Sequence, residues 1–238
     1  MRRILITNDD GIESDGIIRL AAQARRFGEV WVVAPDGQRS AASHSITLHS
    51  HIDLYPHAFP VEGVHAFSCS GTPGDCIRLG CLYVMEEKPD LVLAGINYGY
   101  NAATDIQYSA TVGAALEANF QGIPAIALSE GACDCHEVTD AYLHEVLAEL
   151  IEKPFVPGEI INVNFPGCPL SRCRGILRDL MASKGTFYRD RYEVQERLPG
   201  EGIRLKVKGI YNEDAEPDTD FRAIVDGYIS IGTVRNVG

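Results

Sequence analysis

The sequence predicts an α/β protein with a doubly wound, mostly parallel sheet followed by a β-rich C-terminal arm. Short, continuous apolar runs such as residues 3–7 and 29–35 are typical of strands that are covered on both faces. Segments with apolar residues at helical spacing separate these runs over the first 165 or so residues. In such folds, ligands bind beyond the carboxyl ends of the strands.

The elements follow one another as expected for βα units. After the strand at residues 3–7, a helical pattern opens at Ser14 and ends at Gly28, and the strand at 29–35 completes a βαβ unit. Further strands are expected in short alternating runs between residues 46 and 70, and at 89–95, 123–129 and 159–166. Further helices are expected at residues 74–85, after Ser109, and over residues 138–151.

The pattern changes at residue 176. Residues 181–202 are charged and aromatic with little periodicity, residues 203–211 alternate like an exposed strand, and a short helix and a last strand follow up to residue 234. We therefore expect two parts: a body of residues 1–175, and an arm of residues 176–238 made of a β-hairpin with a returning helix and strand.

Composition excludes several classes of function. The 238 residues include 21 basic and 33 acidic ones, a net charge of −12, and no basic run, so a nucleic-acid duplex is not an expected partner. No apolar run approaches the roughly 20 residues of a membrane span, and the N-terminus does not resemble a signal peptide. A cytoplasmic location is expected, and an anionic substrate would need a cation as mediator.

The seven cysteines allow two interpretations. An odd count without a secretory signal is typical of reduced thiols in a cytosol. The stretch from Cys133 to His136, together with Cys168 and Cys173, is alternatively a soft-metal site. Because the spacing matches no common zinc pattern, ordinary free thiols are the favoured interpretation.

Polar loops follow the carboxyl ends of the predicted strands, and these ends should meet at one edge of the sheet. Asn8, Asp9 and Asp10 follow the first strand. The later loops carry Asp36, Arg39, Ser40, Ser43 and His44, then Asn97, Asn101 and Asp105, then Ser129 and Glu130. Two carboxylates, a hydroxyl and an amide oxygen form a ligand set that Mg²⁺ or Mn²⁺ prefers. Asp9 and Asp10 are alternatively a turn and a helix cap, but their position directly after a core strand favours the metal.

A second candidate feature is a phosphate-binding helix N-terminus. Residues from Ser109 to Thr111 open a helix after a polar loop, where free N–H groups and the helix dipole favour an anion. Plain N-capping by Ser109 remains open. His44 is either an acid–base group or substrate contact, or a solvated loop histidine, and Asp75 either caps a helix or binds ligand.

Two better-known site types are disfavoured. Haloacid-dehalogenase-type phosphatases carry Asp-x-Asp-Gly after their first strand, but Asn8 occupies the place of the nucleophile and cannot form an aspartyl-phosphate. A Rossmann dinucleotide site is disfavoured because no Gly-x-Gly-x-x-Gly follows the first strand.

The order of several separate motifs resembles that of the SurE (survival protein E) family. These motifs are "ILITNDDGIESDGI", "VVAPDGQRSAASHSITL", "SGTPGDCIRLG", "PDLVLAGINYGYNAATDIQYSATVGAALEA", "GIPAIALS" and "INVNFP", with "TDFRAIVDGYISI" near the C-terminus. The resemblance implies a Rossmann-like body and an arm that is exchanged between subunits of a homodimer or homotetramer. It also implies hydrolysis of nucleoside 5'- and 3'-monophosphates with one divalent metal, bound by Asp9, Asp10, Ser40 and Asn97.

The sequence departs from the usual family pattern at three places. Ala41 and Ala110 stand where the family usually has glycine, and the last strand carries Thr233 and Val234 instead of ending in Thr-Pro-Leu. Each alanine adds a methyl group beside the proposed site, so its backbone either has negative φ or the pocket is narrower. The change at Thr233 bears on the oligomer contacts.

The expected activity is that of a phosphomonoesterase. Water activated by the cation would attack phosphorus, with Asp9 and Asp10 as catalytic residues. Asn8, His44, Asn101, Ser109 and Thr111 are the expected phosphate or substrate contacts. Two other classes remain open: a non-catalytic, metal-dependent nucleotide binder, suggested by Ala41 and Ala110, and a structural α/β oligomer in which the aspartates form a charged turn.

Overall fold

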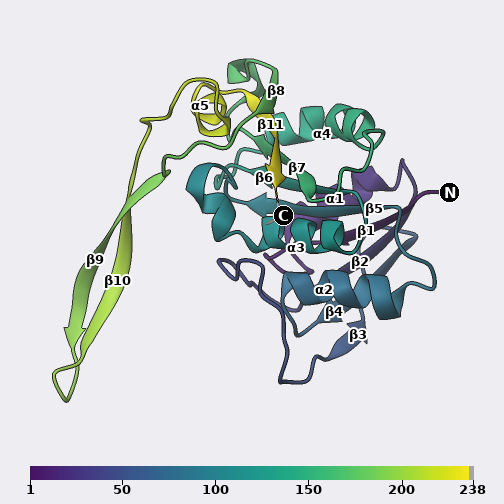
Figure 1. The fold of residues 1–238 in the computed structure, drawn as a ribbon, viewed down its shortest axis with the longest axis horizontal. Coiled ribbons are helices and arrows are strands. Elements are labelled where there is room, and N and C mark those ends of the chain that lie inside the picture. The colour runs from purple at the N-terminus through teal and green to yellow at the C-terminus, as the bar shows by residue number, and fades with distance from the viewer. Residues whose placement is uncertain (236–238) are drawn as a thin grey trace.

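A computed structural model describes residues 1–235 and contains a nine-stranded sheet with helices on both faces (Figure 1). The strands of this sheet are β1 (Arg3–Thr7), β2 (Glu29–Pro35), β3 (Leu54–Pro56), β4 (Val64–Cys69), β5 (Leu91–Tyr98), β6 (Ala125–Glu130), β7 (Glu159–Phe165), β8 (Ile176–Leu180) and β11 (Ile229–Arg235). The helices are α1 (Asp15–Ala24), α2 (Pro73–Leu79), α3 (Ala110–Phe120), α4 (Glu137–Leu150) and α5 (Asp220–Val225).

The strand order is β3-β4-β2-β1-β5-β6-β7-β11-β8. The six central strands from β4 to β7 are mutually parallel, whereas β3 pairs antiparallel with β4 and β11 pairs antiparallel with β7. The chain builds outward from β1 through β2, and later outward on the other side through β5. This reversal makes the gap beyond β1 and β5 a topological switch point. The predicted doubly wound α/β fold is confirmed.

Helices cover the two faces of the sheet in pairs. α1 and α4 pack on one face, around a core that includes Ile17 and Leu147, because their apolar residues recur at helical spacing. α2 and α3 pack together on the other face, around a core that includes Ile77 and Val112. The central strands are therefore buried on both sides, as their continuous apolar sequences predicted.

Two predicted elements differ in the structure. Residues 46–50, expected to form a short strand, have no regular secondary structure, because the amide and hydroxyl of Thr47 bond the carboxylate of Asp75 instead of a neighbouring strand. The helix expected at 74–85 is α-helical only to Leu79 and continues as a π-helical segment over Gly80–Val84. A Cβ at residue 80 would lie 2.5 Å from Leu5 Cδ2, so this glycine permits close packing on β1.

The chain after residue 175 divides between the sheet and a projecting hairpin. β8 forms an edge of the main sheet and β11 returns to lie between β7 and β8. Only β9 (Tyr188–Arg197) and β10 (Ile203–Tyr211) extend away from the body (Figure 1). β9 lies in the segment that was expected to lack periodicity. Residues 236–238 of the predicted arm lie outside the described residues.

The base of the hairpin is attached to the body by a small apolar cluster. Phe187 and Phe221 are buried, their ring centroids lie 4.0 Å apart, and Ala102 and Ala103 pack against them. α5 thereby fixes the start of β9 near the loop that follows β5.

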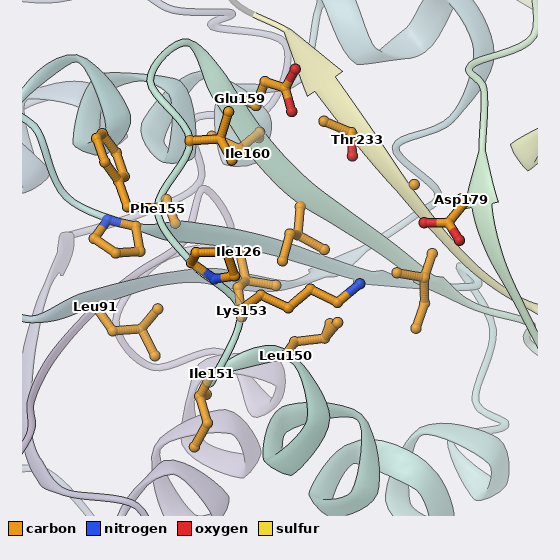
Figure 2. A pocket seen from close by; sticks show the side chains of 17 residues that line it. Leu91, Ile126, Leu150, Ile151, Lys153, Phe155, Glu159, Ile160, Asp179 and Thr233 are labelled. Atoms are coloured by element: carbon orange, nitrogen blue, oxygen red, sulfur yellow. The ribbon is translucent and has the colours of Figure 1, made fainter.

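An apolar cavity of about 190 Å³ lies at the amino edge of the sheet (Figure 2). Its lining includes Leu91, Ala125 and Glu159, the first residues of β5, β6 and β7, with Phe155 and Lys153 from the loop after α4. Since Asp9 and Asp10 follow the carboxyl end of β1, this cavity belongs to the opposite edge of the sheet from the aspartates.

Gly16→Ala should lower the free energy of unfolding by about 1–3 kcal/mol. A Cβ at residue 16 would lie 2.1 Å from the Ile96 carbonyl oxygen, a backbone atom that cannot move without shifting β5. Gly37→Ala is the matched control, because the nearest atom to its Cβ is 3.7 Å away. Urea unfolding of both variants measures the difference, and equal stability of the two would contradict this packing.

Candidate active site

Asp9 is a buried carboxylate at the carboxyl end of β1. Its side chain is 3% exposed, and its Oδ1 accepts a 2.8 Å hydrogen bond from the Thr111 hydroxyl. Burial raises the pKa of Asp9 to about 6, hydrogen bonds from the hydroxyl and backbone of Thr111 oppose this rise, and the neighbouring Asp10 carboxylate adds to it. The N-terminus of α3 thus points at Asp9.

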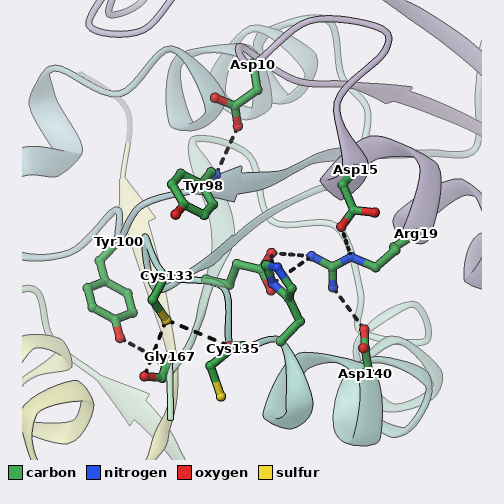
Figure 3. Close-up of polar contacts among 11 residues, drawn as sticks. Asp10, Asp15, Arg19, Tyr98, Tyr100, Cys133, Cys135, Asp140 and Gly167 are labelled. Atoms are coloured by element: carbon green, nitrogen blue, oxygen red, sulfur yellow. Dashed lines mark hydrogen bonds and ion pairs between the residues drawn. The ribbon is translucent and has the colours of Figure 1, made fainter.

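Asp10 links β1 to the end of β5. Its Oδ2 accepts a 2.9 Å hydrogen bond from the Tyr98 amide (Figure 3). Burial raises the pKa of this carboxyl group as well, and the Tyr98 hydrogen bond opposes the rise. Asp9 and Asp10 lie in a bend after β1 and are directed by different partners. Asp9 faces α3, where Thr111 binds it, while Asp10 faces the end of the neighbouring strand β5.

The loop with Ser40 is attached to Asp9 through the backbone. The Arg39 amide donates a 2.7 Å hydrogen bond to the Asp9 carbonyl oxygen, and Ser40 is the next, exposed residue. The Arg39 guanidinium turns away from the aspartates to bond Asp36 and the Ser70 carbonyl. The loop therefore brings the Ser40 backbone to the site without bringing a positive charge.

The two alanines that replace the usual glycines differ in conformation. Ala41 has φ of +59°, in the left-handed region that favours glycine, whereas Ala110 is outside that region, fully buried, at the first position of α3. The strain at Ala41 lies directly beside Ser40. Ala110 instead adds a methyl group at the helix N-terminus without backbone strain.

Asn97 presents an oxygen near the aspartates. It occupies β5 one residue before Tyr98, whose amide binds Asp10, and its Nδ2 donates a 2.7 Å hydrogen bond to the Gly99 carbonyl. With the amide nitrogen so engaged, the oxygen of the same side chain is free to act as a ligand.

The donor set fits a hard divalent cation. Within residues 1–235, no Arg, Lys or His side chain forms an ion pair with Asp9 or Asp10. A buried carboxylate next to a half-buried one, without a counter-charge, costs stability, and a cation would remove that cost. No group of three or more His, Cys, Asp or Glu side chains in the described chain is arranged for a metal. A site here must therefore use Ser and Asn oxygens beside the carboxylates, which suits Mg²⁺ or Mn²⁺.

The other expected substrate contacts are distributed around this centre. Thr111 is committed to Asp9, and Ser109 caps α3 by accepting from the Val112 amide at 3.1 Å. Asn101 is buried and donates to Ser129 Oγ at 2.8 Å. Asn8 is buried and donates from Nδ2 to Gly11 and Ser14, and its Oδ1 has no partner in the described chain.

His44 is directed away from the aspartates. Its Nε2 lies 3.0 Å from Oε2 of Glu117, a buried residue that Arg78 and Gln121 also contact. Glu117 is six residues beyond Thr111 on α3, about 9 Å along the helix axis. Asp75 is likewise a structural group, because its carboxylate forms a capping box with Thr72.

Several neighbouring groups were missed by the sequence analysis. Asn162 and Asn164 on β7 bind the backbone of Asn101 and so fix the loop after β5. Their signal was two polar residues at alternate positions of an otherwise apolar strand. Arg19 and His136 both contact Glu130. They lie on or beside helices, and no pattern in the sequence indicated them.

All seven cysteines are free thiols in the structure. Cys133 contacts the Gly167 carbonyl, with 3.6 Å between sulfur and oxygen. The described residues contain no group of three or more His, Cys, Asp or Glu side chains that could hold a metal ion. Among these residues, no helix combines the length and hydropathy that crossing a bilayer requires.

Fold and site together define a doubly wound α/β protein with a candidate cation site at its topological switch point. Comparison with known proteins assigns a family to this fold and site. Residues 4–186 match the family described as "Survival protein SurE". The chain belongs to the SurE family.

The relatives are similar over nearly their whole length. The chain is 38% identical over 234 residues to the 5'-nucleotidase SurE of Synechococcus sp. (strain JA-3-3Ab), covering 96% of this chain and 89% of that protein. It is 39% identical over 234 residues to the 5'/3'-nucleotidase SurE of Cronobacter sakazakii, covering 96% and 88%. The crystal structure of the SurE protein from Aquifex aeolicus superposes with a TM-score of 0.81 at 30% identity, covering 98% of this chain and 93% of that one.

Ala41→Gly should raise the free energy of unfolding by about 0.5–1 kcal/mol. Relief of the left-handed conformation is worth about 1–2 kcal/mol, and the added flexibility of the unfolded chain offsets part of it. Ala42→Gly, where φ is not positive, should lower stability instead. Thermal unfolding compares the two, and a loss of stability in Ala41→Gly would contradict strain at this position.

Proposed function

We propose that this protein is a divalent-metal-dependent phosphomonoesterase that hydrolyses nucleoside 5'- and 3'-monophosphates to nucleoside and phosphate. The observation that supports this proposal is the pair of adjacent carboxylates, the buried Asp9 and the half-buried Asp10, which has no counter-charge in the described chain and adjoins Asn97. The names of the SurE relatives support the reaction class.

Asp9, Asp10, Ser40 and Asn97 would hold one Mg²⁺ or Mn²⁺ ion. When bound, the cation would bind phosphate oxygen and lower the pKa of a coordinated water. The chain's own residues orient the reaction. Thr111 holds the Asp9 carboxylate in place, and the Tyr98 amide does the same for Asp10.

Phosphate contacts are assigned to groups at the N-terminus of α3 and beside it; Ser109 and Asn101 retain a free donor, whereas both Nδ2 hydrogens of Asn8 are engaged by Gly11 and Ser14. The Ser109 hydroxyl accepts from Val112, which leaves its own hydrogen available to a phosphate oxygen. The first amides of α3 and the buried side chains of Asn8 and Asn101 lie at the same edge of the sheet. His44, which contacts Glu117, is left without a catalytic role.

Asp9→Asn should keep the fold and lower phosphate release by at least about 100-fold, because the amide neither carries the charge nor orients the cation equally. The assay measures phosphate from a panel of 5'- and 3'-nucleoside monophosphates after chelation, then with Mg²⁺ or Mn²⁺ restored. Asp53→Asn, at an exposed loop position, is the control. Near-wild-type release by Asp9→Asn would overturn the metal assignment.

A second candidate function is non-catalytic nucleotide binding, favoured by the strained Ala41 beside Ser40. Tight nucleotide binding without phosphate release over hours would select it. A purely structural role would leave the melting temperature unchanged on adding Mn²⁺ or Mg²⁺, since a ligand that binds only the native state stabilises it.

We also propose a homodimer or homotetramer in which the β9–β10 hairpin contacts a second copy. One face of the hairpin exposes Tyr192, Val194, Leu205 and Val207, each more than half exposed. An isolated two-stranded hairpin is marginally stable in water. Packing of this apolar face against a second copy of the chain would stabilise it. We propose a cytoplasmic location, because an odd number of cysteines is typical of thiols that a cytosol keeps reduced.

Val207→Glu should dissociate the oligomer, because it buries a charge in the proposed contact. Ile210→Glu is the matched control: it introduces the same residue on the same strand, but on the opposite, charged face. Sedimentation analysis measures the mass of both variants. An unchanged assembly of Val207→Glu would exclude this face as the contact.

A further inference from the structure

The turn that carries Ser40 has a strained backbone. Within this turn, residues 39–43, Ala41 and Ser43 both have positive φ, of +59° and +54°. Residues with a Cβ rarely adopt this left-handed conformation. It persists only where the surrounding contacts hold it. The contacts that hold the turn therefore also decide where the Ser40 hydroxyl lies.

The two ends of this turn are bound to different parts of the body. The Arg39 amide donates to the Asp9 carbonyl oxygen at one end. At the other end, the Ser43 amide donates a 3.0 Å hydrogen bond to the carbonyl oxygen of Tyr108, just before α3. The backbone here lies against the helix, since a Cβ at Gly113 would be 2.6 Å from the Ser43 carbonyl oxygen. The turn thus spans the distance from the aspartates to α3.

His44 follows the turn directly and binds a buried carboxylate on α3. Its Nε2 lies 3.0 Å from Oε2 of Glu117, which is 5% exposed. Burial acts to raise the pKa of Glu117, but hydrogen bonds from His44 and Gln121, with nearby positive charge, hold this pKa below its usual value. An ionised carboxylate only accepts hydrogen bonds, so Nε2 of His44 donates, whether the ring is neutral or charged. Glu117 is therefore a fixed anchor for this side chain.

We propose that His44 is a positioning residue for the metal site: by binding Glu117 it holds the turn against α3 and so fixes Ser40 beside the aspartates. This inference rests on the proposed function, in which Ser40 is a metal ligand. Loss of a group that orients a metal ligand typically weakens metal binding by about 10- to 100-fold. His44 acts in this way through the backbone of the strained turn, without touching the cation.

The test is the dissociation constant for Mn²⁺, measured by calorimetry on the whole protein without substrate. His44→Ala should weaken Mn²⁺ binding by about 10-fold or more, because the turn loses its side-chain anchor. His44→Gln should stay within about 3-fold of the wild type, since its amide nitrogen reaches about as far as Nε2 and donates to the same carboxylate. The melting temperature of the metal-free variants records any general loss of stability separately.

Arg78→Gln is the matched control. Nη1 of Arg78 lies 3.3 Å from Oε1, the other carboxylate oxygen of Glu117, but Arg78 is on α2 and forms no hydrogen bond with residues 39–44 in the described chain. The variant removes a partner of the same buried carboxylate, so it should lower the melting temperature and keep the Mn²⁺ affinity within about 3-fold. A purely structural role of His44 would lower the melting temperature of His44→Ala and leave its Mn²⁺ affinity unchanged.

The outcomes separate this inference from the proposed function. Wild-type Mn²⁺ affinity in His44→Ala, or an equal loss of affinity in Arg78→Gln, would overturn the positioning role and leave the phosphomonoesterase standing. A wild type that neither binds Mn²⁺ nor releases phosphate would overturn both. If His44→Ala does not fold, His44→Asn decides. Its amide is too short to reach Glu117, so unchanged Mn²⁺ affinity in this variant would overturn the inference.

Discussion

The structure around the carboxyl edge of the sheet is organised by two adjacent carboxylates that have no cationic side chain to pair with among residues 1–235. In this part of the chain Asp9 and Asp10 are held by neutral donors, among them the hydroxyl of Thr111 and the amide of Tyr98. Such donors orient a carboxylate without neutralising it. The negative charge is therefore preserved and fixed in position, which is what binding a hard cation requires.

The two aspartates at this edge of the sheet face different surroundings. Asp9 faces α3, the helix whose N-terminus favours anions, whereas Asp10 faces the side of Tyr98 and Glu130. The bend that follows β1 and the two hydrogen bonds, from Thr111 to Asp9 and from Tyr98 to Asp10, hold the side chains in these directions. A phosphoryl group and the remainder of a substrate can thus meet different chemistry within one strand spacing.

The sequence predicted the elements whose signals are local. Continuous apolar runs identified the central strands, and the ends of parallel strands brought Asp9, Asp10 and Asn97 to one edge. Contacts between distant residues were not predictable: nothing local to His44 indicated that its ring would turn to Glu117, 73 residues later. The left-handed backbone conformation of Ala41 was also not predictable from the sequence, because alanine rarely adopts it.

The insertion of β11 between β7 and β8 sets the order in which the chain can complete its sheet. During synthesis β7 pairs with β6 while its other edge has no partner until residues 229–235 have been made. β8 pairs only with β11 in the described sheet, so it also has no partner until β11 has been made. A nascent chain therefore presents an open strand edge while the hairpin is still being translated, and in this interval it is most exposed to pairing with the wrong strand.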